Sequence, residues 1–168
     1  MRFPSNLYWK PGKRLLNRRQ QIAYIELYEP YRQALEDELK TVFESRQGVL
    51  YDVLRYHLGW VDEQGQPLSG SAPLNFQSAL ALATCDALGG DYKKALPVAA
   101  SVDLIFNFTL VHGDVQAGQA EPGDRPSIWW VWGPAQAINA GDGLHALGRT
   151  TMMRLAQNDV PADKVLRA

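Results

Sequence analysis

The 168 residues are 46% hydrophobic, 10% aromatic and 21% charged, which is typical of one soluble globular domain and excludes intrinsic disorder. Seventeen Lys and Arg against 18 Asp and Glu give a net charge of −1, which disfavours nucleic acid or anionic lipid as a partner. The single cysteine, Cys85, excludes an internal disulfide, and its apolar neighbours favour a buried thiol in a reducing cytoplasm.

Helical patterns dominate the first part of the chain. Residues 1–17 show no clear period, which predicts an irregular basic and aromatic arm followed by the start of a helix. Pro30 suits a first helical position, and apolar residues then recur at helical spacing over 29–48. The same spacing recurs over 50–59 and predicts a further amphipathic helix. The polar residues of 61–73, rich in Gly, Pro and Ser, predict a loop.

The next helix is predicted over about 73–88. Gly89 and Gly90 follow it, and left-handed conformations at both glycines would end a helix well. Asp91 is expected to cap the element that comes next.

Two long helices complete the pattern. Pro97 opens an apolar helix over 98–115, and a polar loop follows over 116–126. The last long helix is predicted to begin near Pro134 and to break at 158–161. No segment alternates with period two, so we predict an all-α fold.

The location of the protein follows from two further patterns. No unbroken apolar stretch follows the basic N-terminal residues, as a signal peptide requires. No uninterrupted apolar run approaches the roughly 20 residues of a membrane span. We therefore expect residues 18–168 to form a single helical domain of a soluble, cytoplasmic protein with no membrane span.

Three stretches together resemble the isoprenyl diphosphate synthase family, also called polyprenyl synthetases. They are Ala87-Leu88-Gly89-Gly90-Asp91, the helix from Ala95-Leu96-Pro97 to Leu110-Val111-His112, and Trp132-Gly133-Pro134-Ala135-Gln136 with the residues to Asp142. The resemblance covers about residues 48–168, roughly the N-terminal half of a typical member. It implies a truncated isoprenoid-synthase-type bundle of antiparallel helices around a deep cavity, usually dimeric.

The resemblance also implies Mg²⁺-dependent condensation of an allylic diphosphate with isopentenyl diphosphate, yet the motifs for that chemistry are changed. The first aspartate-rich motif is degraded to the sequence 113–117, where only Asp114 remains of three aspartates. The Lys and Arg expected for binding the second diphosphate are absent at 73–78, and the Arg-Arg-Gly motif becomes 122–124. The second aspartate-rich motif would lie beyond Ala168.

The chain keeps residues that pack in the family but lacks the family's reactive groups. This combination favours a non-catalytic pseudoenzyme in isoprenoid biosynthesis. We expect an oligomerising or modulatory subunit that pairs with a second copy or with a longer synthase-like chain, and that needs no cofactor. The alternative is a prenyltransferase active only with a second chain and with Mg²⁺, in which the residual diphosphate or metal contacts are Asp114, Gln116 and Arg125. A nonfunctional gene fragment is a further possibility.

A carrier of an apolar isoprenoid ligand is another alternative. Its cavity would be lined by Leu104, Phe108 and Thr109, of which the last two occupy the positions that floor the prenyl tunnel in the family.

The histidines are interpreted as structural. His112, on the apolar helix, is expected to be hydrogen-bonded within the fold. A zinc site is not expected, because His57 and His145 have no Cys, His or Asp partner at ligand spacing.

Two further groups of residues are assigned to packing. Asp103, Asn107 and Asp114 lie near one helical stripe, which favours a polar seam or cap over a cation site. Aromatic residues before the last helix and small residues within it are assigned to a subunit interface, to which this last stretch contributes in the family. The interface residues are Trp129, Trp132, Gly141, Gly148 and Met152.

Overall fold

The computed structural model describes residues 18–68, 75–118, 125–158, 160–165 and 167, so the arm predicted for 1–17 lies outside the described residues. The elements in chain order are α1 (Arg18–Phe43), α2 (Val49–His57), α3 (Phe76–Ala87), η1 (Tyr92–Ala95), α4 (Leu96–Ala117), α5 (Ile128–Met152), η2 (Met153–Asn158) and α6 (Ala162–Val165). Over these residues the one β feature is an isolated antiparallel bridge between Val61 and Pro67. The predicted all-α class is confirmed.

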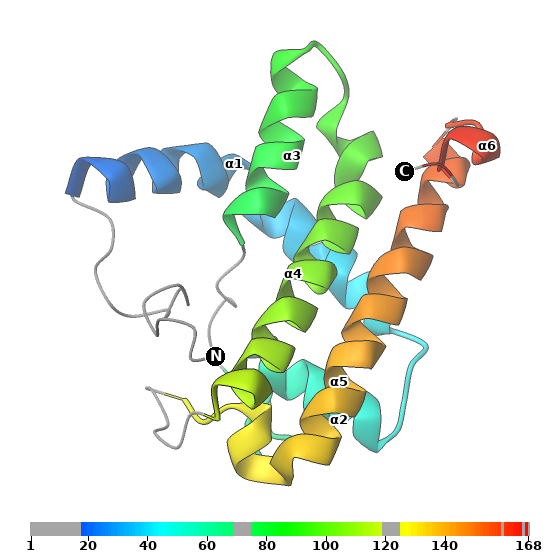
Figure 1. Ribbon diagram of the computed structural model, residues 1–168. Helices are drawn as coiled ribbons and strands as arrows, with labels where there is room; N and C mark the ends of the chain where they lie inside the picture. The colour runs from blue at the N-terminus through cyan, green and yellow to red at the C-terminus, as the bar shows by residue number, and fades with distance from the viewer. Residues whose placement is uncertain (1–17, 69–74, 119–124, 159, 166, 168) are drawn as a thin grey trace.

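The helices form two layers around α4. In Figure 1, α3, α4 and α5 stand side by side, while the later half of α1 crosses behind α4 and α2 lies behind the lower part of α5. Helix α4 packs against α1, α3 and α5, and its contact with α5 is the most extensive in the fold.

The core between these layers draws on every long helix. Each of them contributes one leucine with no exposed surface, and these are Leu35, Leu54, Leu82, Leu104 and Leu144. Burying such a side chain stabilises a fold by about 1.5–3 kcal/mol. The apolar residues that recur at helical spacing in the sequence therefore form one core shared by these helices.

The sequence pattern predicted that Pro30 opens a helix, but Pro30 lies inside α1. A proline in a helix interior removes one backbone hydrogen bond and bends the axis, and α1 changes direction along its length in Figure 1. The helix tolerates this because its second half is anchored by buried residues such as Leu35, Leu39 and Phe43.

The end of α3 corrects two expectations. Gly89 adopts the predicted left-handed conformation, with φ of 78°, but Gly90 has no positive φ. Gly90 is needed for a different reason, since a Cβ there would lie 2.8 Å from the sulfur of Cys85. The sequence predicted a buried thiol at Cys85, but Cys85 is half-buried. The predicted cap is confirmed, because the Asp91 carboxylate accepts a hydrogen bond from the Lys93 backbone N–H at 3.0 Å.

Helix α5 begins earlier than predicted. The aromatic residues before Pro134 already form helical turns, capped by the Ser127 hydroxyl, which accepts from the Trp130 backbone N–H. Gly133 then breaks the helix, with φ of 80° and ψ of 171°, and Pro134 opens its longer part. The sequence pattern therefore predicted the helical segment after Gly133 and missed the segment before it.

Helix α4 begins with Pro97 in its first turn, as predicted, and ends at Gly118 in a left-handed conformation. Residues 92–117 have a mean hydropathy of 1.5 over their most apolar 18 residues, which by length and composition alone would be enough to cross a membrane. Here the segment is the central helix of the bundle, and 39% of those 18 residues are buried.

Candidate functional site

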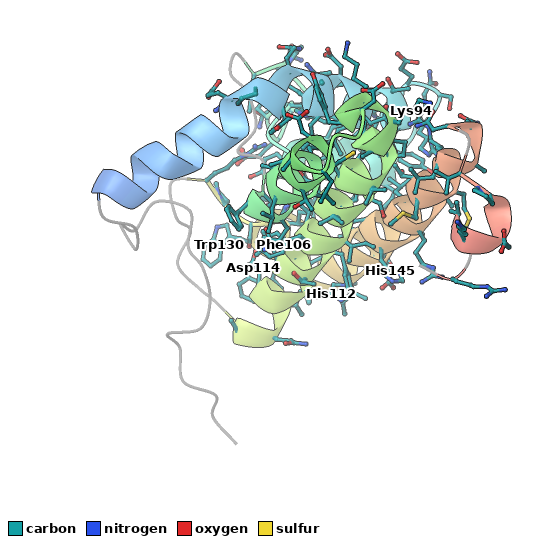
Figure 2. The ribbon with its side chains drawn as sticks, turned by 90° about the horizontal axis from the view of Figure 1, so that it is seen from above. Lys94, Phe106, His112, Asp114, Trp130 and His145 are labelled. Carbon is teal, nitrogen blue, oxygen red and sulfur yellow. The ribbon has the colours of Figure 1, made fainter. Side chains whose placement is uncertain are left out.

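The C-terminal turns of α4 carry the residues at which the sequence suggested diphosphate or metal contacts. Asp114 is half-buried and Gln116 is exposed. Gly113, on the turn that also carries Asp114, is buried, and Ala117 is exposed at the end of the helix. In Figure 2, Asp114 lies toward the side of Phe106 and Trp130, away from His112 and His145.

Arg125, the third of these predicted contacts, is held by the fold itself. Its guanidinium lies 3.8 Å from the centroid of the Tyr56 ring and donates a hydrogen bond to the carbonyl of Val61. The Tyr56 hydroxyl in turn donates to the carbonyl of Pro126 at 2.7 Å. These contacts fasten the start of α5 to α2, so Arg125 has a structural role in this fold.

The donors at this end of α4 do not fit a pair of Mg²⁺ ions held by protein carboxylates. Positions 113 and 117 lie one turn apart and carry Gly and Ala, which leaves Asp114 as the carboxylate of this turn. Mg²⁺ is usually held by one or two carboxylates together with substrate phosphates. Among the described residues, no group of three or more His, Cys, Asp or Glu side chains is placed to bind a metal ion.

The three residues predicted to line an apolar cavity differ in burial, and the cavity itself stays a prediction. Leu104 is in the core, Thr109 is exposed, and its hydroxyl donates to the Phe106 carbonyl at 2.6 Å. Phe108 is half-buried between two imidazoles, with ring centroids 4.7 Å from His112 and 5.2 Å from His145.

A cavity is present at the opposite end of α4. It has a volume of about 360 Å³ and lies between α3, α4 and η2, where Cys85, Val98 and Leu155 line it. None of the residues that the sequence singled out for an apolar ligand contributes to it.

Two buried residues, Asn75 and Asp103, and two half-buried ones, His57 and Asn107, form a hydrogen-bonded network across the middle of α4. The Asp103 carboxylate, which is 1% exposed, accepts hydrogen bonds from the side-chain amides of Asn75 and Asn107. The side-chain oxygen Oδ1 of Asn107 lies 3.0 Å from Nε2 of His57. The network joins the end of α2 to the start of α3 through α4.

Burial shifts the pKa values of both ionisable groups of the network. Burial raises the pKa of Asp103 to about 7, although the hydrogen bonds from Asn75, Ser78 and Asn107 act in the opposite direction. Burial lowers the pKa of His57 to about 4, against the contact with Asn107, and Arg125 lowers it further. At neutral pH the imidazole of His57 is therefore uncharged.

The predicted polar seam is confirmed for Asp103 and Asn107, which lie four residues apart on α4. The contributions of His57 and Asn75 were missed. Their partners lie 50 and 28 residues away along the chain, so no local spacing could have indicated them.

The glycines assigned to a subunit interface are used inside the chain. A Cβ at Gly141 would lie 2.2 Å from the His112 ring, and one at Gly148 would lie 2.7 Å from the side chain of Ile105. Both glycines are buried and let α5 approach α4 closely. The predicted structural role of His112 is confirmed, because its Nε2 lies 3.1 Å from the carbonyl oxygen of Ile138.

The other predicted interface residues lie nearer the surface. The Trp132 ring packs edge-on against Tyr56 at 4.8 Å, and Trp129 and Met152 are half-buried. Trp130, in the same aromatic cluster, is 47% exposed. A subunit contact through these side chains stays a prediction.

Comparison with known proteins finds a family model and relatives that match this chain. A family model described as "Polyprenyl synthetase" matches residues 73–167. The chain is 44% identical over 108 residues to a geranylgeranyl diphosphate synthase of Mycobacterium tuberculosis, an alignment that covers 64% of this chain and 31% of the relative. It is 38% identical over 101 residues to a (2E,6E)-farnesyl diphosphate synthase of Mycobacterium bovis, covering 60% of this chain and 28% of the relative.

A solved structure shows the same fold. The crystal structure of a polyprenyl synthetase from Streptomyces coelicolor A3(2) superimposes with a TM-score of 0.73 at 32% identity, over 86% of this chain and 42% of that chain. The chain therefore spans about a third of the length of these curated relatives and about two fifths of that structure.

Proposed function

The chain belongs to the polyprenyl synthetase family, and from that premise we propose that it acts in isoprenoid biosynthesis as a non-catalytic, modulatory subunit. In this proposal it is a soluble cytoplasmic protein that binds a longer synthase-like chain and alters the length or rate of formation of that chain's product. It does not itself condense prenyl diphosphates.

The observation that carries the proposal is the composition of the last turn of α4. The two positions that share its face, 113 and 117, carry Gly and Ala, although the residues around them match the relatives closely enough to keep the fold. An α-helix places side chains four residues apart on one face, so carboxylates there would point together. Without them the turn contributes packing and no pair of metal ligands.

The exposed apolar surface supports the need for a partner. Helices that are apolar all round are normally buried on all sides, whereas α4 has 39% of its most apolar 18 residues buried and its other large apolar side chains half-buried. Beside it, α3 carries Phe76 and Leu80 one turn apart, exposed to 46% and 45%. Apolar residues gathered on one side of a fold mark an interaction site. A synthase-like chain supplying further helices would cover this side.

The test is to titrate the protein into a longer polyprenyl synthetase from the same source and to measure product lengths and rate. We expect the product distribution or the rate to change, with saturation at a fixed ratio of the two chains. No change in products, rate or complex size would refute the modulatory role.

Leu80→Glu should abolish the effect, because it places a charge on the exposed apolar stripe of α3. Gln77→Glu is the matched control, since it adds the same charge to an already polar, exposed position of that helix. An equal loss in both variants would exclude the α3 stripe as the contact.

The same assay tests the enzymatic alternative through Asp114→Asn. A prenyltransferase completed by a second chain would lose its Mg²⁺-dependent activity in this variant, because Asp114 is the carboxylate left on that turn. The modulatory proposal predicts that the variant alters products as the original protein does.

A further inference from the structure

The cavity at the start of α4 is formed by three separate elements. Cys85 comes from the last turn of α3, Val98 from the first turn of α4, and Leu155 from η2. Asp114 lies about 24 Å from Val98 along α4, at a rise of roughly 1.5 Å per residue. The cavity is therefore separate from the turn at which the sequence suggested diphosphate or metal contacts.

Two polar contacts hold the η2 wall of this cavity in place. The Asn158 side-chain amide donates a hydrogen bond to the Lys94 carbonyl at 2.9 Å, which ties the end of η2 to η1. The Arg154 guanidinium lies 2.9 Å from the carboxylate of Glu38 on α1. Lys94 lies at the end of the bundle where η2 follows α5 (Figure 2). The cavity is thus formed by the folded chain before any ligand arrives, as ligand sites usually are.

The lining of the cavity favours an apolar, uncharged molecule. Aliphatic side chains, among them Val98 and Leu155, line it beside Cys85. Asp91 and Lys94 also line it and carry opposite charges. An anion near Lys94 would meet the Asp91 carboxylate, and a cation near Asp91 would meet the Lys94 ammonium. Moving either kind of ion from water into such a site is unfavourable, because no net opposite charge compensates for the lost hydration.

The volume of the cavity limits the size of the molecule. Ligand pockets usually measure about 300–1,000 Å³, and this cavity, at about 360 Å³, is at the lower end. An apolar cavity of about 150 Å³ holds one benzene molecule. By that comparison, the cavity holds a molecule of up to roughly fourteen carbon atoms.

We propose that this cavity is a binding site for a small, uncharged, apolar molecule of the size of a medium-chain alcohol. The body of the ligand packs between Val98 and Leu155 and covers the Cys85 thiol. The site goes beyond the modulatory role, because it uses neither the exposed stripe of α3 nor a second chain. It also differs from the carrier cavity predicted from the sequence, to which none of these residues was assigned.

Alkylation of Cys85 by iodoacetamide, followed by intact mass spectrometry, tests the proposal on the purified full chain. Cys85 is the one cysteine of the sequence, so the rate reports on this site alone. Octan-1-ol is the probe, and it should slow alkylation with saturation. At about ten times its dissociation constant roughly a tenth of the protein is unliganded, so the rate should fall about tenfold. Octanoate has the same chain with a negative charge, and equal protection should need at least about tenfold more of it.

Two variants fill the cavity from different walls. Leu155→Trp adds a ring from η2, and Val98→Phe adds one from α4. In both, octan-1-ol should no longer slow alkylation, because the new ring occupies the space of the ligand. Ala156→Trp is the matched control, since it adds the same ring at the exposed neighbouring position and should keep full protection. Circular dichroism shows which variants fold, and either filled variant that folds is sufficient for the test.

Three outcomes would overturn the proposal. They are an alkylation rate unchanged by octan-1-ol, protection by octanoate at the same concentration, and protection retained in a folded variant with a filled cavity. None of them bears on the modulatory role, because that role is measured by the products of a partner synthase.

Discussion

The buried network at the middle of α4 leads to a specific prediction about how stability depends on pH. Burial lowers the pKa of His57 from 6.5 to about 4, so between these values the unfolded chain holds a proton there that the folded chain does not. Burial raises the pKa of Asp103 from 3.8 to about 7, so over the same interval the folded chain holds a proton there that the unfolded chain does not. Folding therefore moves one proton from His57 to Asp103.

The two contributions have opposite signs and cancel. The His57 contribution makes stability rise with pH from about 4 to 6.5, and the Asp103 contribution makes it fall with pH from 3.8 to about 7. Together they make almost no net contribution to the pH dependence between pH 4 and 6.5. Each alone would give a slope of about 1.4 kcal/mol per pH unit.

Asp103→Asn removes one side of this balance and keeps an acceptor for the amides of Asn75 and Asn107. Relative to the original protein, the free energy of unfolding of the variant should increase by about 3 kcal/mol as the pH is raised from 4 to 6.5. His57→Gln should show the opposite trend, with relative stability falling over that range. Urea unfolding at several pH values measures both differences, in which all other titrating groups cancel.

Parallel curves for the original protein and Asp103→Asn would show that the pKa of Asp103 is not raised in the folded chain. The reasoning from burial would then be wrong. The chemical shift of the His57 ring protons gives an independent check, with a midpoint near pH 4 expected in the folded protein.

The remaining predictions concern close contacts and strain, and urea unfolding at constant pH measures all of them. Gly148→Ala should destabilise the fold by about 1–3 kcal/mol, because the new Cβ would lie 2.7 Å from a side chain of α4. Gly143→Ala is its control on the same helix and should be neutral or stabilising by up to about 1 kcal/mol, since its new contacts begin at an ordinary 3.5 Å. Gly133→Ala should cost about 1–3 kcal/mol, because φ of 80° with ψ of 171° is a region open essentially to glycine, and an unchanged midpoint would show that the kink is not required. Arg125→Met should lose up to about 2 kcal/mol of stability with the stacking on Tyr56 and leave the product spectrum of a partner synthase unchanged; altered products with unchanged stability would return Arg125 to a diphosphate-binding role.

Much of the fold could be predicted from local patterns because the helices are amphipathic and their ends carry distinctive residues. The cap at Asp91 and the first turn at Pro97 depend on their own neighbours, so their positions in the sequence were sufficient. Pro30 was misjudged and the helical turns before Gly133 were missed for the opposite reason, since tertiary packing keeps helical turns on both sides of a residue that locally favours a break.

The candidate site was less predictable, because its geometry depends on contacts between distant segments. Gly141 looked available for a subunit interface until the fold placed the His112 ring against it. From the sequence, Arg125 was a candidate contact for a diphosphate or metal ligand, whereas in the fold its guanidinium lies over the Tyr56 ring. Of the two side-chain amides that donate to Asp103, that of Asn107 lies on α4 and was indicated by its spacing, whereas that of Asn75 comes from 28 residues away and was not.

Native mass spectrometry of the protein purified gently from its source tests the central claim most directly, because it reads both the mass of the assembly and the identity of any chain bound in it. The modulatory role predicts an assembly that contains this chain together with a longer polyprenyl synthetase. An assembly containing this chain and no synthase would contradict that role.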